Sequence, residues 1–193
     1  MRNFRNRIVI FLFIACFLSG SQPFEASSIT EPISKGARFP DIIFAETLSK
    51  EARAYLDTQK KSNFSLKDTK GDIYIIEVFS TYCTSCPKNI QLLNSVYSLI
   101  AEDPVLKTKV KVLAIAVGNN QNEVKTYNRE YKVLYPVLTD YRFTAHKALG
   151  NPYVPFTIFA KRDVRGRIMV ADTHRGLFDS KEEIMEIIRK LLK

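Results

Sequence analysis

Apolar runs and amphipathic segments alternate along most of the chain. Residues 72–79 (DIYIIEVF) are rich in β-branched and aromatic side chains, which is typical of a central strand buried on both faces. Apolar side chains then recur at helical spacing from Asn89 to Ala101, and Pro104 is expected to end this helix. A further apolar run at residues 111–117 predicts a second strand.

The same alternation continues to the C-terminus. Ser180 and Glu183 have the spacing of a capping box, which opens a last amphipathic helix that reaches Leu192. Strands that alternate with helices and end in a hairpin and a helix indicate an α/β domain, with a mixed central sheet flanked by helices. The other predicted elements are a helix at 47–56, a polar turn at 118–120, a helix at 122–131, a strand at 135–138, a helix at 143–149, and strands at 156–160 and 167–171 joined by a turn at 163–166.

The beginning of the chain has the layout of a secretory signal peptide. Basic residues precede an apolar run at residues 8–18, and small residues follow it. This run is too short to span a bilayer as a helix, which needs about 20 apolar residues. We therefore expect residues 1–21 to be a signal peptide cleaved after Ser21, residues 22–35 to be a linker and residues 36–193 to form one domain.

Cys16 lies inside the apolar run and leaves a second interpretation open. The tetrad that ends at this cysteine (FIAC) resembles a lipoprotein processing site, which would leave a lipid anchor on Cys16. Phe13 is a poor residue at its position in such a site, and the apolar run continues past the cysteine to Leu18. The sequence thus favours a protein exported to the periplasm without a membrane anchor, with a lipid anchor at Cys16 as the alternative.

The composition is that of a globular protein, with 46% hydrophobic and 25% charged residues. The formal net charge of +9 would fall to +6 without the three arginines of residues 1–21. Binding of nucleic acid requires basic residues gathered on one face or interleaved with aromatic residues, whereas here the lysines and arginines are scattered. We interpret the charge as a solvated surface and expect no nucleic-acid partner.

Cys83 and Cys86 are the only cysteines of the predicted mature chain. A disulfide that closes so short a loop removes little chain entropy, so stabilising the fold is a weak reason for the pair. A CxxC between a buried strand and a helix has a chemical reason instead, because the N–H groups and partial positive charge of a helix N-terminus favour a thiolate. We expect Cys83 to be exposed at that end and Cys86 to be shielded.

An isolated CxxC is also half of a zinc site. Zinc takes four ligands, and His146 and His174, the only histidines, stand at separations that form no recognisable metal pattern. The sequence therefore indicates redox chemistry through a Cys83–Cys86 disulfide, with no metal site and no cofactor.

The segment at residues 75–90 (IIEVFSTYCTSCPKNI) resembles the active-site strand, CxxC and helix of the thioredoxin superfamily. The strand and helix expected within residues 112–149 resemble the insertion that marks its exported TlpA/ResA-like, redoxin-type branch. The resemblance covers residues 36–193 and is specific for the fold and the redox chemistry, but not for the partner. Three further segments match the layout of the branch, namely ARFPDIIF (37–44), FSLKDTKG (64–71) and VPFTIF (154–159).

The resemblance implies roles for single residues. Cys83 would be the nucleophile, Cys86 the resolving cysteine and Pro155 a cis-proline that faces the disulfide. The backbone of Val154 would pair with the bound substrate. The expected substrate contacts are Val154, Tyr82, Thr84 and Ser85.

Glu77 falls where the resemblance places a buried acid that moves the proton of the resolving cysteine. The residues support this role independently, because Glu77 interrupts an otherwise apolar strand, and burying a carboxylate is costly without a role or a partner. The alternative is that Glu77 faces a solvated edge or pairs with a lysine.

Four positions depart from the pattern of the branch. Tyr82 stands where many relatives have tryptophan, and Asn89 stands where several reductases have glutamate, three residues after the second cysteine. Pro87 follows Cys86 directly, and Phe156 takes the place of a threonine that often follows the cis-proline. These departures put a specialised role in cytochrome c maturation in doubt, but not the exchange chemistry.

We therefore expect an exported enzyme that exchanges thiols and disulfides with proteins, acting as a reductant. The resemblance implies that its electrons come from a membrane-bound thiol carrier. Two alternatives stay open. A peroxidase of the same fold would need a proline and a threonine where this chain has Ile76 and Ser80. A copper-delivery protein would use two cysteines separated by three residues, one more than here, and a distal histidine, for which His146 or His174 could serve.

Overall fold

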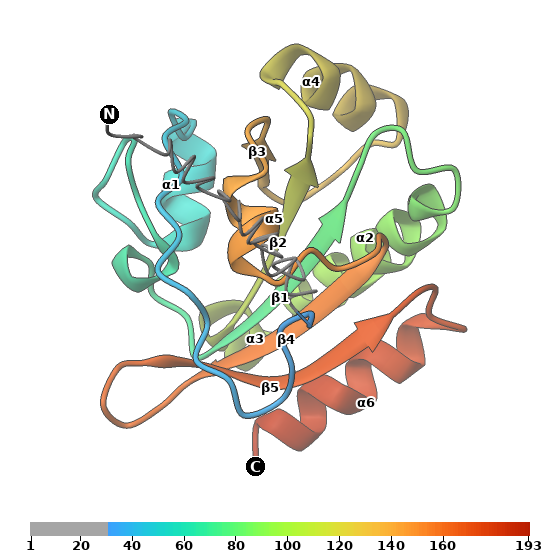
Figure 1. The fold of residues 1–193 in the computed structure, drawn as a ribbon. Coiled ribbons are helices and arrows are strands. Elements are labelled where there is room, and N and C mark those ends of the chain that lie inside the picture. The colour runs from blue at the N-terminus through green and yellow to red at the C-terminus, as the bar shows by residue number, and fades with distance from the viewer. Residues whose placement is uncertain (1–30) are drawn as a thin grey trace, which may run out of the picture.

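A sheet of five strands forms the centre of the protein in the computed structural model, which describes residues 31–193 (Figure 1). The strands are β1 (Ile73–Phe79), β2 (Val110–Val117), β3 (Val137–Asp140), β4 (Phe156–Arg162) and β5 (Ile168–Arg175). They lie in the order β3-β2-β1-β4-β5, so β1 is central. β1 pairs in parallel with β2 and antiparallel with β4, which makes the sheet mixed, as the sequence predicts.

Helices cover both faces of this sheet (Figure 1). The helices are α1 (Lys50–Leu56), the short 3-10 helix η1 (Leu66–Asp68), α2 (Cys86–Glu102), α3 (Pro104–Lys109), α4 (Gln121–Glu130), α5 (Thr144–Ala148) and α6 (Lys181–Leu191). Buried residues of α1 and α5 belong to the core on one face, and those of α2, α4 and α6 belong to the core on the other. The α/β fold class expected from the sequence is confirmed.

Successive residues of β1 point to opposite faces of the sheet. Its even-numbered residues pack into the core on the side of α1 and α5. Its odd-numbered apolar residues pack into the core on the side of α2 and α6, together with Cys86. Because Glu77 is also odd-numbered, its carboxyl group projects into this second core, on the side of the cysteines.

Helix α2 begins at Cys86, three residues before the predicted start. Ser85 precedes it without a side-chain cap, and Pro87 occupies the first turn, where its missing N–H costs no hydrogen bond. The apolar periodicity could not show this turn, because its second and third residues are a proline and a lysine. Because Cys86 is the first residue of α2, its N–H has no partner within the helix and is available to a group outside it.

Pro104 does not only end the preceding helix, as expected, but also begins α3. The last residue of α2 is Glu102, and the side chain of Asp103 then accepts hydrogen bonds from the N–H groups of Val105 (2.8 Å) and Leu106 (3.0 Å). Aspartate before proline suits the N-cap and first position of a helix. The prediction missed α3 because this helix contributes no buried residue and so has no apolar stripe.

The capping box predicted for α6 forms only in part. Ser180 Oγ accepts a hydrogen bond from the N–H of Glu183 at 3.4 Å, as expected. The Glu183 carboxylate, however, accepts the N–H of Asp179 at 3.1 Å rather than that of Ser180. The reciprocal bond is therefore displaced by one residue, and the helix still begins at Lys181.

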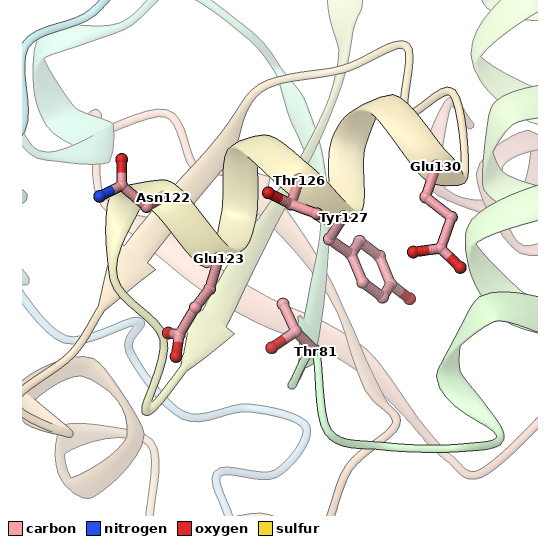
Figure 2. A pocket seen from close by; sticks show the side chains of 6 residues that line it. All are labelled: Thr81, Asn122, Glu123, Thr126, Tyr127 and Glu130. Carbon is pink, nitrogen blue, oxygen red and sulfur yellow. The ribbon is translucent and has the colours of Figure 1, made fainter.

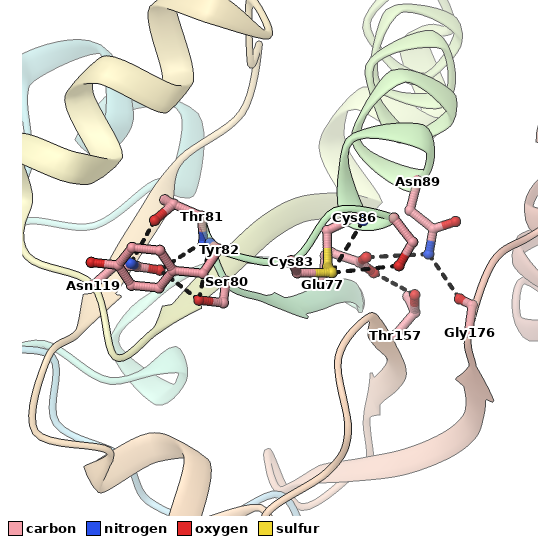
Figure 3. The surroundings of a disulfide bond; sticks show 11 residues. Glu77, Ser80, Thr81, Tyr82, Cys83, Cys86, Asn89, Asn119, Thr157 and Gly176 are labelled. Carbon is pink, nitrogen blue, oxygen red and sulfur yellow. Dashed lines mark hydrogen bonds between the residues drawn. A yellow bond between two sulfur atoms is a disulfide. The ribbon is translucent and has the colours of Figure 1, made fainter.

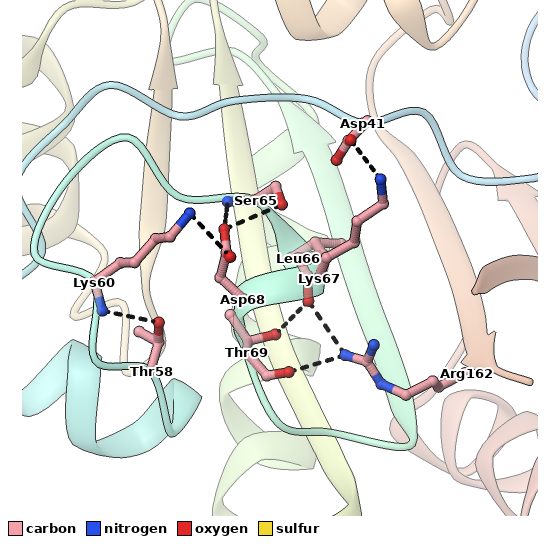
Figure 4. A network of polar contacts seen from close by, with 9 residues as sticks. All are labelled: Asp41, Thr58, Lys60, Ser65, Leu66, Lys67, Asp68, Thr69 and Arg162. Atoms are coloured by element: carbon pink, nitrogen blue, oxygen red, sulfur yellow. Dashed lines mark hydrogen bonds and ion pairs between the residues drawn. The ribbon is translucent and has the colours of Figure 1, made fainter. Parts of the chain in front are cut away.

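Arg162, at the end of β4, fixes the segment that leads into β1 (Figure 4). Its guanidinium donates to the carbonyl oxygens of Leu66 (3.2 Å) and Thr69 (2.9 Å). It also donates to the hydroxyl of Tyr74 at 2.5 Å. These bonds tie η1 and the start of the central strand to the strand beside it.

Glu46 covers part of the edge strand β3. Its Oε1 accepts the main-chain N–H of Thr139 at 2.9 Å, and its Oε2 accepts the hydroxyl of the same residue at 3.2 Å. A main-chain donor that an edge strand would otherwise present to solvent is thereby occupied. Burial raises the pKa of Glu46 to about 7, and the hydrogen bonds from Thr139 oppose this rise.

The last residues of the predicted linker contact the domain. The N–H of Ile33 donates to the carbonyl oxygen of Leu149 at 2.9 Å. Gly150 has a φ of +77°, and a side chain there would bring its Cβ to 2.1 Å from the carbonyl oxygen of Glu31. Both the backbone conformation and this close approach therefore call for glycine.

The predictions for residues 1–30, which comprise the signal peptide, Cys16 and most of the linker, lie outside the described residues. Within residues 31–193, no helix has the length and hydropathy needed to cross a membrane.

Candidate active site

The two cysteines lie just beyond the carboxyl end of β1, where the chain enters α2 (Figure 3). A disulfide joins Cys83 to Cys86, with 5.5 Å between their Cα atoms. Cys86 is fully buried, whereas Cys83 is partly exposed. The predicted pairing is present, and the two sulfur atoms differ in their access to solvent.

The start of α2 can hold negative charge on Cys83. The main-chain N–H of Cys86 donates to Cys83 Sγ at 3.1 Å, and Ser85 Oγ lies 3.5 Å from the same sulfur. Once the disulfide is reduced, both groups would stabilise a thiolate, as would the partial positive charge of the helix N-terminus. This arrangement favours Cys83 as the attacking sulfur.

Glu77 lies close to the disulfide, between the first turn of α2 and strand β4 (Figure 3). Its side chain is fully buried, and within residues 31–193 no lysine or arginine forms an ion pair with it. Thr157 donates its hydroxyl to Oε2 at 2.5 Å, and Asn89 donates its side-chain amide to Oε1 at 3.2 Å. Burial raises the pKa of Glu77 to about 7, against the two hydrogen bonds, which lower it. The structure thus excludes both a solvated edge and a lysine partner for Glu77.

The peptide bond between Val154 and Pro155 is cis. Because Val78 pairs with Phe156 in the register of β1 and β4, the proline lies next to the carboxyl end of β1, where the loop of the cysteines begins. The N–H of Gly176 donates to the carbonyl oxygen of Pro155 at 2.9 Å. The loop after β5 therefore braces the loop of the cis-proline.

A cleft of about 140 Å³ opens at the cis-proline. Val154 and Tyr153 line it, and Tyr153 is 95% exposed. Pro32 from the leading segment and Arg175 from the end of β5 also line it. Val154, which the resemblance assigns to substrate pairing, thus stands at an accessible cleft.

The other predicted substrate contacts, Tyr82, Thr84 and Ser85, lie on the loop of the cysteines. Tyr82 is 72% exposed, Thr84 is exposed and Ser85 is partly exposed. The hydroxyl of Tyr82 donates to Glu123 Oε1 at 2.5 Å. All three residues are accessible to a partner, and Tyr82 is held by the start of α4.

Asn119, which the sequence predicts only as part of a polar turn, fixes the loop before the cysteines (Figure 3). This fully buried side chain donates from Nδ2 to the hydroxyl of Thr81 at 2.6 Å. Its Oδ1 accepts the N–H of Thr81 at 2.9 Å and the hydroxyl of Ser80 at 3.3 Å. Its position could have indicated this role, because it follows β2, and the carboxyl ends of parallel strands meet at one edge of the sheet.

A second cleft, of about 420 Å³, lies between α4 and the loop that leads from β1 to the cysteines (Figure 2). Thr81 forms one wall and α4 forms the other. Glu123 and Glu130 line it, and Figure 2 shows both carboxyl groups on the side of α4 that faces Thr81. Two carboxyl groups therefore line a cleft beside the loop that leads to the cysteines, although the chain as a whole is basic.

The two histidines are engaged with main-chain oxygens. His146 Nε2 lies 2.9 Å from the carbonyl oxygen of Pro152, and His174 Nε2 lies 3.0 Å from that of Leu177. The ring of His174 also stacks on Phe178, with 3.8 Å between centroids. In the part of the chain that the structure describes, no group of three or more histidine, cysteine, aspartate and glutamate residues is arranged to hold a metal ion.

The fold and the site together define the class of protein. A mixed sheet with a CxxC disulfide at the carboxyl end of its central strand, and a cis-proline before the neighbouring strand, are the parts of a thioredoxin-fold thiol-disulfide oxidoreductase of the TlpA/ResA-like redoxin type. The chain belongs to the AhpC/TSA family, whose model matches residues 45–173.

Curated relatives of the chain carry the same class name. A thiol-disulfide oxidoreductase ResA from Bacillus cereus (strain ATCC 10987 / NRS 248) is 23% identical over 192 residues, which are 97% of this chain and 98% of the relative. A thiol-disulfide oxidoreductase ResA from Bacillus thuringiensis subsp. konkukian (strain 97-27) is 25% identical over 146 residues, which are 75% of this chain and 78% of the relative.

Solved structures share the fold. A thiol:disulfide interchange protein DsbE from Chlorobium tepidum superposes with a TM-score of 0.59 and 15% identity, covering 83% of this chain and 99% of its own. StoA from Bacillus subtilis superposes with a TM-score of 0.52 and 20% identity, covering 68% of this chain and 92% of its own. At these identities the superpositions show the architecture alone.

Alkylation of the reduced protein should distinguish the two thiols. Near neutral pH, iodoacetamide should label Cys83 about tenfold or more faster than Cys86, because Cys83 is partly exposed beside an N–H donor and Cys86 is fully buried. Peptide mass spectrometry after short exposures measures both rates. In urea-unfolded protein the two rates should become alike. Equal labelling of the two thiols in the folded protein would contradict the assignment.

Proposed function

We propose that this protein reduces disulfides of other proteins outside the cytoplasm, through Cys83 and Cys86. The observation that carries the proposal is the asymmetric pair of sulfur atoms at the start of α2. One sulfur is partly exposed beside an N–H donor, and the other is buried on the same side of the sheet as a buried acid.

The first step of the reaction uses the exposed sulfur. The thiolate of Cys83 attacks one sulfur of a client disulfide, and a mixed disulfide between Cys83 and the client forms as the client bond breaks. The second client sulfur leaves as a thiolate. The N–H of Cys86 and the hydroxyl of Ser85 hold the attacking sulfur before the step.

The second step releases the client. The thiol of Cys86 gives its proton to the carboxylate of Glu77 and attacks Cys83 Sγ, which forms the internal disulfide and frees the remaining client sulfur. Two electrons have then passed from the dithiol to the client. The fully buried Glu77 suits this role, because burial raises the pKa of its carboxyl group to about 7, near the working pH.

The client would lie across the cis-proline loop. Its backbone would pair with Val154, beside Pro155, and Tyr82, Thr84 and Ser85 would contact it next to the cysteines. The accessible cleft at Val154 and the exposure of Tyr82 support this placement. The oxidised protein would receive electrons from a membrane-bound thiol carrier, as the resemblance to the TlpA/ResA-like branch implies.

A peroxidase or copper-delivery activity has less support from the site. A peroxidase site would need a proline and a threonine at the positions of Ile76 and Ser80. Ile76 instead packs into the core on the side of the sheet away from the cysteines, and the hydroxyl of Ser80 donates to Asn119. The Nε2 atoms of His146 and His174, which copper binding would need, lie against main-chain oxygens.

The proposed function predicts disulfide reduction through a mixed disulfide at Cys83. With a thiol donor, the wild-type protein should reduce insulin at least tenfold faster than the donor alone, whereas Cys83→Ser should not exceed the donor. Cys86→Ser should accumulate mixed disulfides with client proteins, since the resolving thiol is gone. Trapping through Cys86 in the Cys83→Ser variant, or tight Cu(I) binding or peroxide turnover without insulin reduction, would overturn the proposal.

The pH dependence of stability tests the burial of Glu77. Between its ordinary pKa of 4.5 and the folded value of about 7, the folded state holds a proton that the unfolded state has lost. The stability contributed by this group is therefore fully present below about pH 4.5 and is lost as the pH rises towards 7, by an amount of the order of 3 kcal/mol. Glu77→Gln should remove this fall, which urea unfolding at a series of pH values measures.

Glu77→Gln should also slow the release of a mixed disulfide by about 10² while leaving the attack of Cys83 in place, because Cys86 loses its proton acceptor. Glu46→Gln is the matched control, since Glu46 has a pKa raised to about 7 by burial but lies at the edge strand. It should change the stability profile and leave both thiol steps unchanged. If Glu77→Gln destabilises the protein at neutral pH without slowing release, Glu77 is a structural residue.

The order of basic, apolar and small residues at the start of the chain supports export. We expect the mature protein to begin near Gln22 and to appear in the soluble extracytoplasmic fraction. Intact mass of the purified protein checks the N-terminus. A mass that corresponds to a diacylated Cys16 would instead establish a lipoprotein, and an uncleaved chain in the cytoplasm would refute export.

A further inference from the structure

A fully buried amide connects Glu77 to the loop after β5. Asn89 lies one turn beyond Cys86 on α2, and its side chain uses all of its donors and one acceptor site (Figure 3). Nδ2 donates to Glu77 Oε1 at 3.2 Å and to the carbonyl oxygen of Gly176 at 3.0 Å. Oδ1 accepts the N–H of Phe178 at 3.0 Å.

The loop determines which end of the amide faces Glu77. A main-chain carbonyl can only accept and a main-chain N–H can only donate, so Gly176 requires Nδ2 and Phe178 requires Oδ1. Turning the amide over would break both bonds. Asn89 can therefore present only an N–H group to Glu77.

An N–H donor favours the charged form of a carboxyl group. Thr157 supplies the one other hydrogen bond recorded for Glu77 within residues 31–193, and no basic side chain of that range forms an ion pair with it. Within residues 31–193, two hydrogen-bond donors therefore stabilise the charged form of Glu77, and the amide of Asn89 is one of them.

Other titratable groups face this region from neighbouring elements. Tyr127 of α4 and Tyr135 before β3 belong to the same core, and burial raises the pKa of both hydroxyls, so both stay neutral while Glu77 titrates. His174 of β5 pairs with Thr157 in the register, but its Nδ1 lies 3.6 Å from Glu183 and its ring stacks on Phe178. Tyr97 and Tyr131 pack against the same core, and burial raises the pKa of both hydroxyls. Once the disulfide is reduced, the thiols of Cys83 and Cys86 are further titratable groups of this region.

We propose that Asn89 is a positioning residue, which holds Glu77 as the carboxylate that accepts the proton of Cys86. The inference rests on the proposed exchange reaction and adds a residue that acts through Glu77. The N–H of Gly176 also donates to the carbonyl oxygen of Pro155, so the loop that orients Asn89 is the loop that braces the cis-proline. Hydrogen bonds through Asn89 and Gly176 thus connect Glu77 to the cis-proline loop.

The helix offers a matched control for this residue. Asn94, 8% exposed on the same helix, donates from Nδ2 to the carbonyl oxygens of Tyr131 (3.4 Å) and Lys132 (3.1 Å) and accepts the N–H of Leu134 at 3.0 Å. It therefore holds a loop through its amide as Asn89 does, but within residues 31–193 its hydrogen bonds are to main-chain groups and none is to a carboxyl group. Asn89→Leu and Asn94→Leu each remove a loop clamp, and only the first removes a donor to Glu77.

The test measures the titration of Glu77 and the release step in parallel. ¹³C NMR of the labelled glutamate carboxyl carbon in the oxidised protein gives the pKa of Glu77 without any thiol reaction. Asn89→Leu should raise this pKa by about one unit, which lowers the charged fraction at pH 7 about fivefold. The rate of mixed-disulfide release should rise with pH, and the midpoint of this rise should move to higher pH by the same amount. Asn94→Leu should leave both the pKa of Glu77 and the midpoint of the release rate at their wild-type values.

Two further variants keep the test decisive. If Asn89→Leu does not fold, Asn89→Asp keeps the shape and the acceptor for Phe178, and should give two coupled titration steps in place of one, with one of them above the wild-type value. In a Glu77→Gln background, Asn89→Leu should slow release no further. An unchanged pKa in the Asn89 variants, an equal shift in Asn94→Leu, or an additive loss in the double variant would overturn the proposal. A wild-type protein without exchange activity would refute the proposed function alone, because the NMR titration would still report on Asn89.

Discussion

Within residues 31–193, no cation pairs with the carboxyl group of Glu77, which is buried on the same side of the sheet as the cysteines, and two hydrogen-bond donors compensate for its burial. One donor comes from the neighbouring strand, through Thr157, and the other comes from the helix of the cysteines, through Asn89. Because an unpaired buried carboxylate is costly, these three elements must keep their relative positions for the group to ionise at all. The chemistry assigned to a four-residue motif therefore depends on the packing of the whole sheet.

The sequence predicted the strands well because the central ones are buried on both faces. All residues of β1 and of β2 are buried, and such strands appear as continuous apolar runs. The helix α3 was missed because it has no buried residue, and η1 was missed because three residues are too few to show a periodicity. The start of α2 was also missed, because a turn that begins with cysteine and proline has no apolar periodicity. Ser180 was placed correctly, while the partner of its capping glutamate depended on the path of the chain just before the helix.

The candidate site divides in the same way. Cys83 and Cys86 are evident from their spacing, and Glu77 is evident as the charged residue in the interior of an apolar strand. The roles of Pro155 and Val154 rest on the resemblance to a known branch, because a proline after a valine has no signal of its own. The position of Asn119 after a strand could have indicated its role, although its partner lies 38 positions away along the chain. The contacts of Asn89 could not be predicted, since its partner in the loop after β5 lies 87 positions away. Local pattern gives the reacting atoms, whereas the residues that hold them depend on tertiary structure.

The close contact between Glu31 and Gly150 determines which end of the chain is suitable for fusion to another protein. The leading segment reaches the domain five residues before Pro155, and Pro32 lines the same cleft as Val154. A fluorescent protein or affinity tag joined there would share space with an incoming client. At the other end of the chain, Lys161, which pairs with the first residue of β1, donates to the carbonyl oxygen of Leu191. The C-terminus therefore lies at the end of the sheet where β1 begins, opposite to the end that carries the cysteines. A protein fused there would not block access to the cysteines.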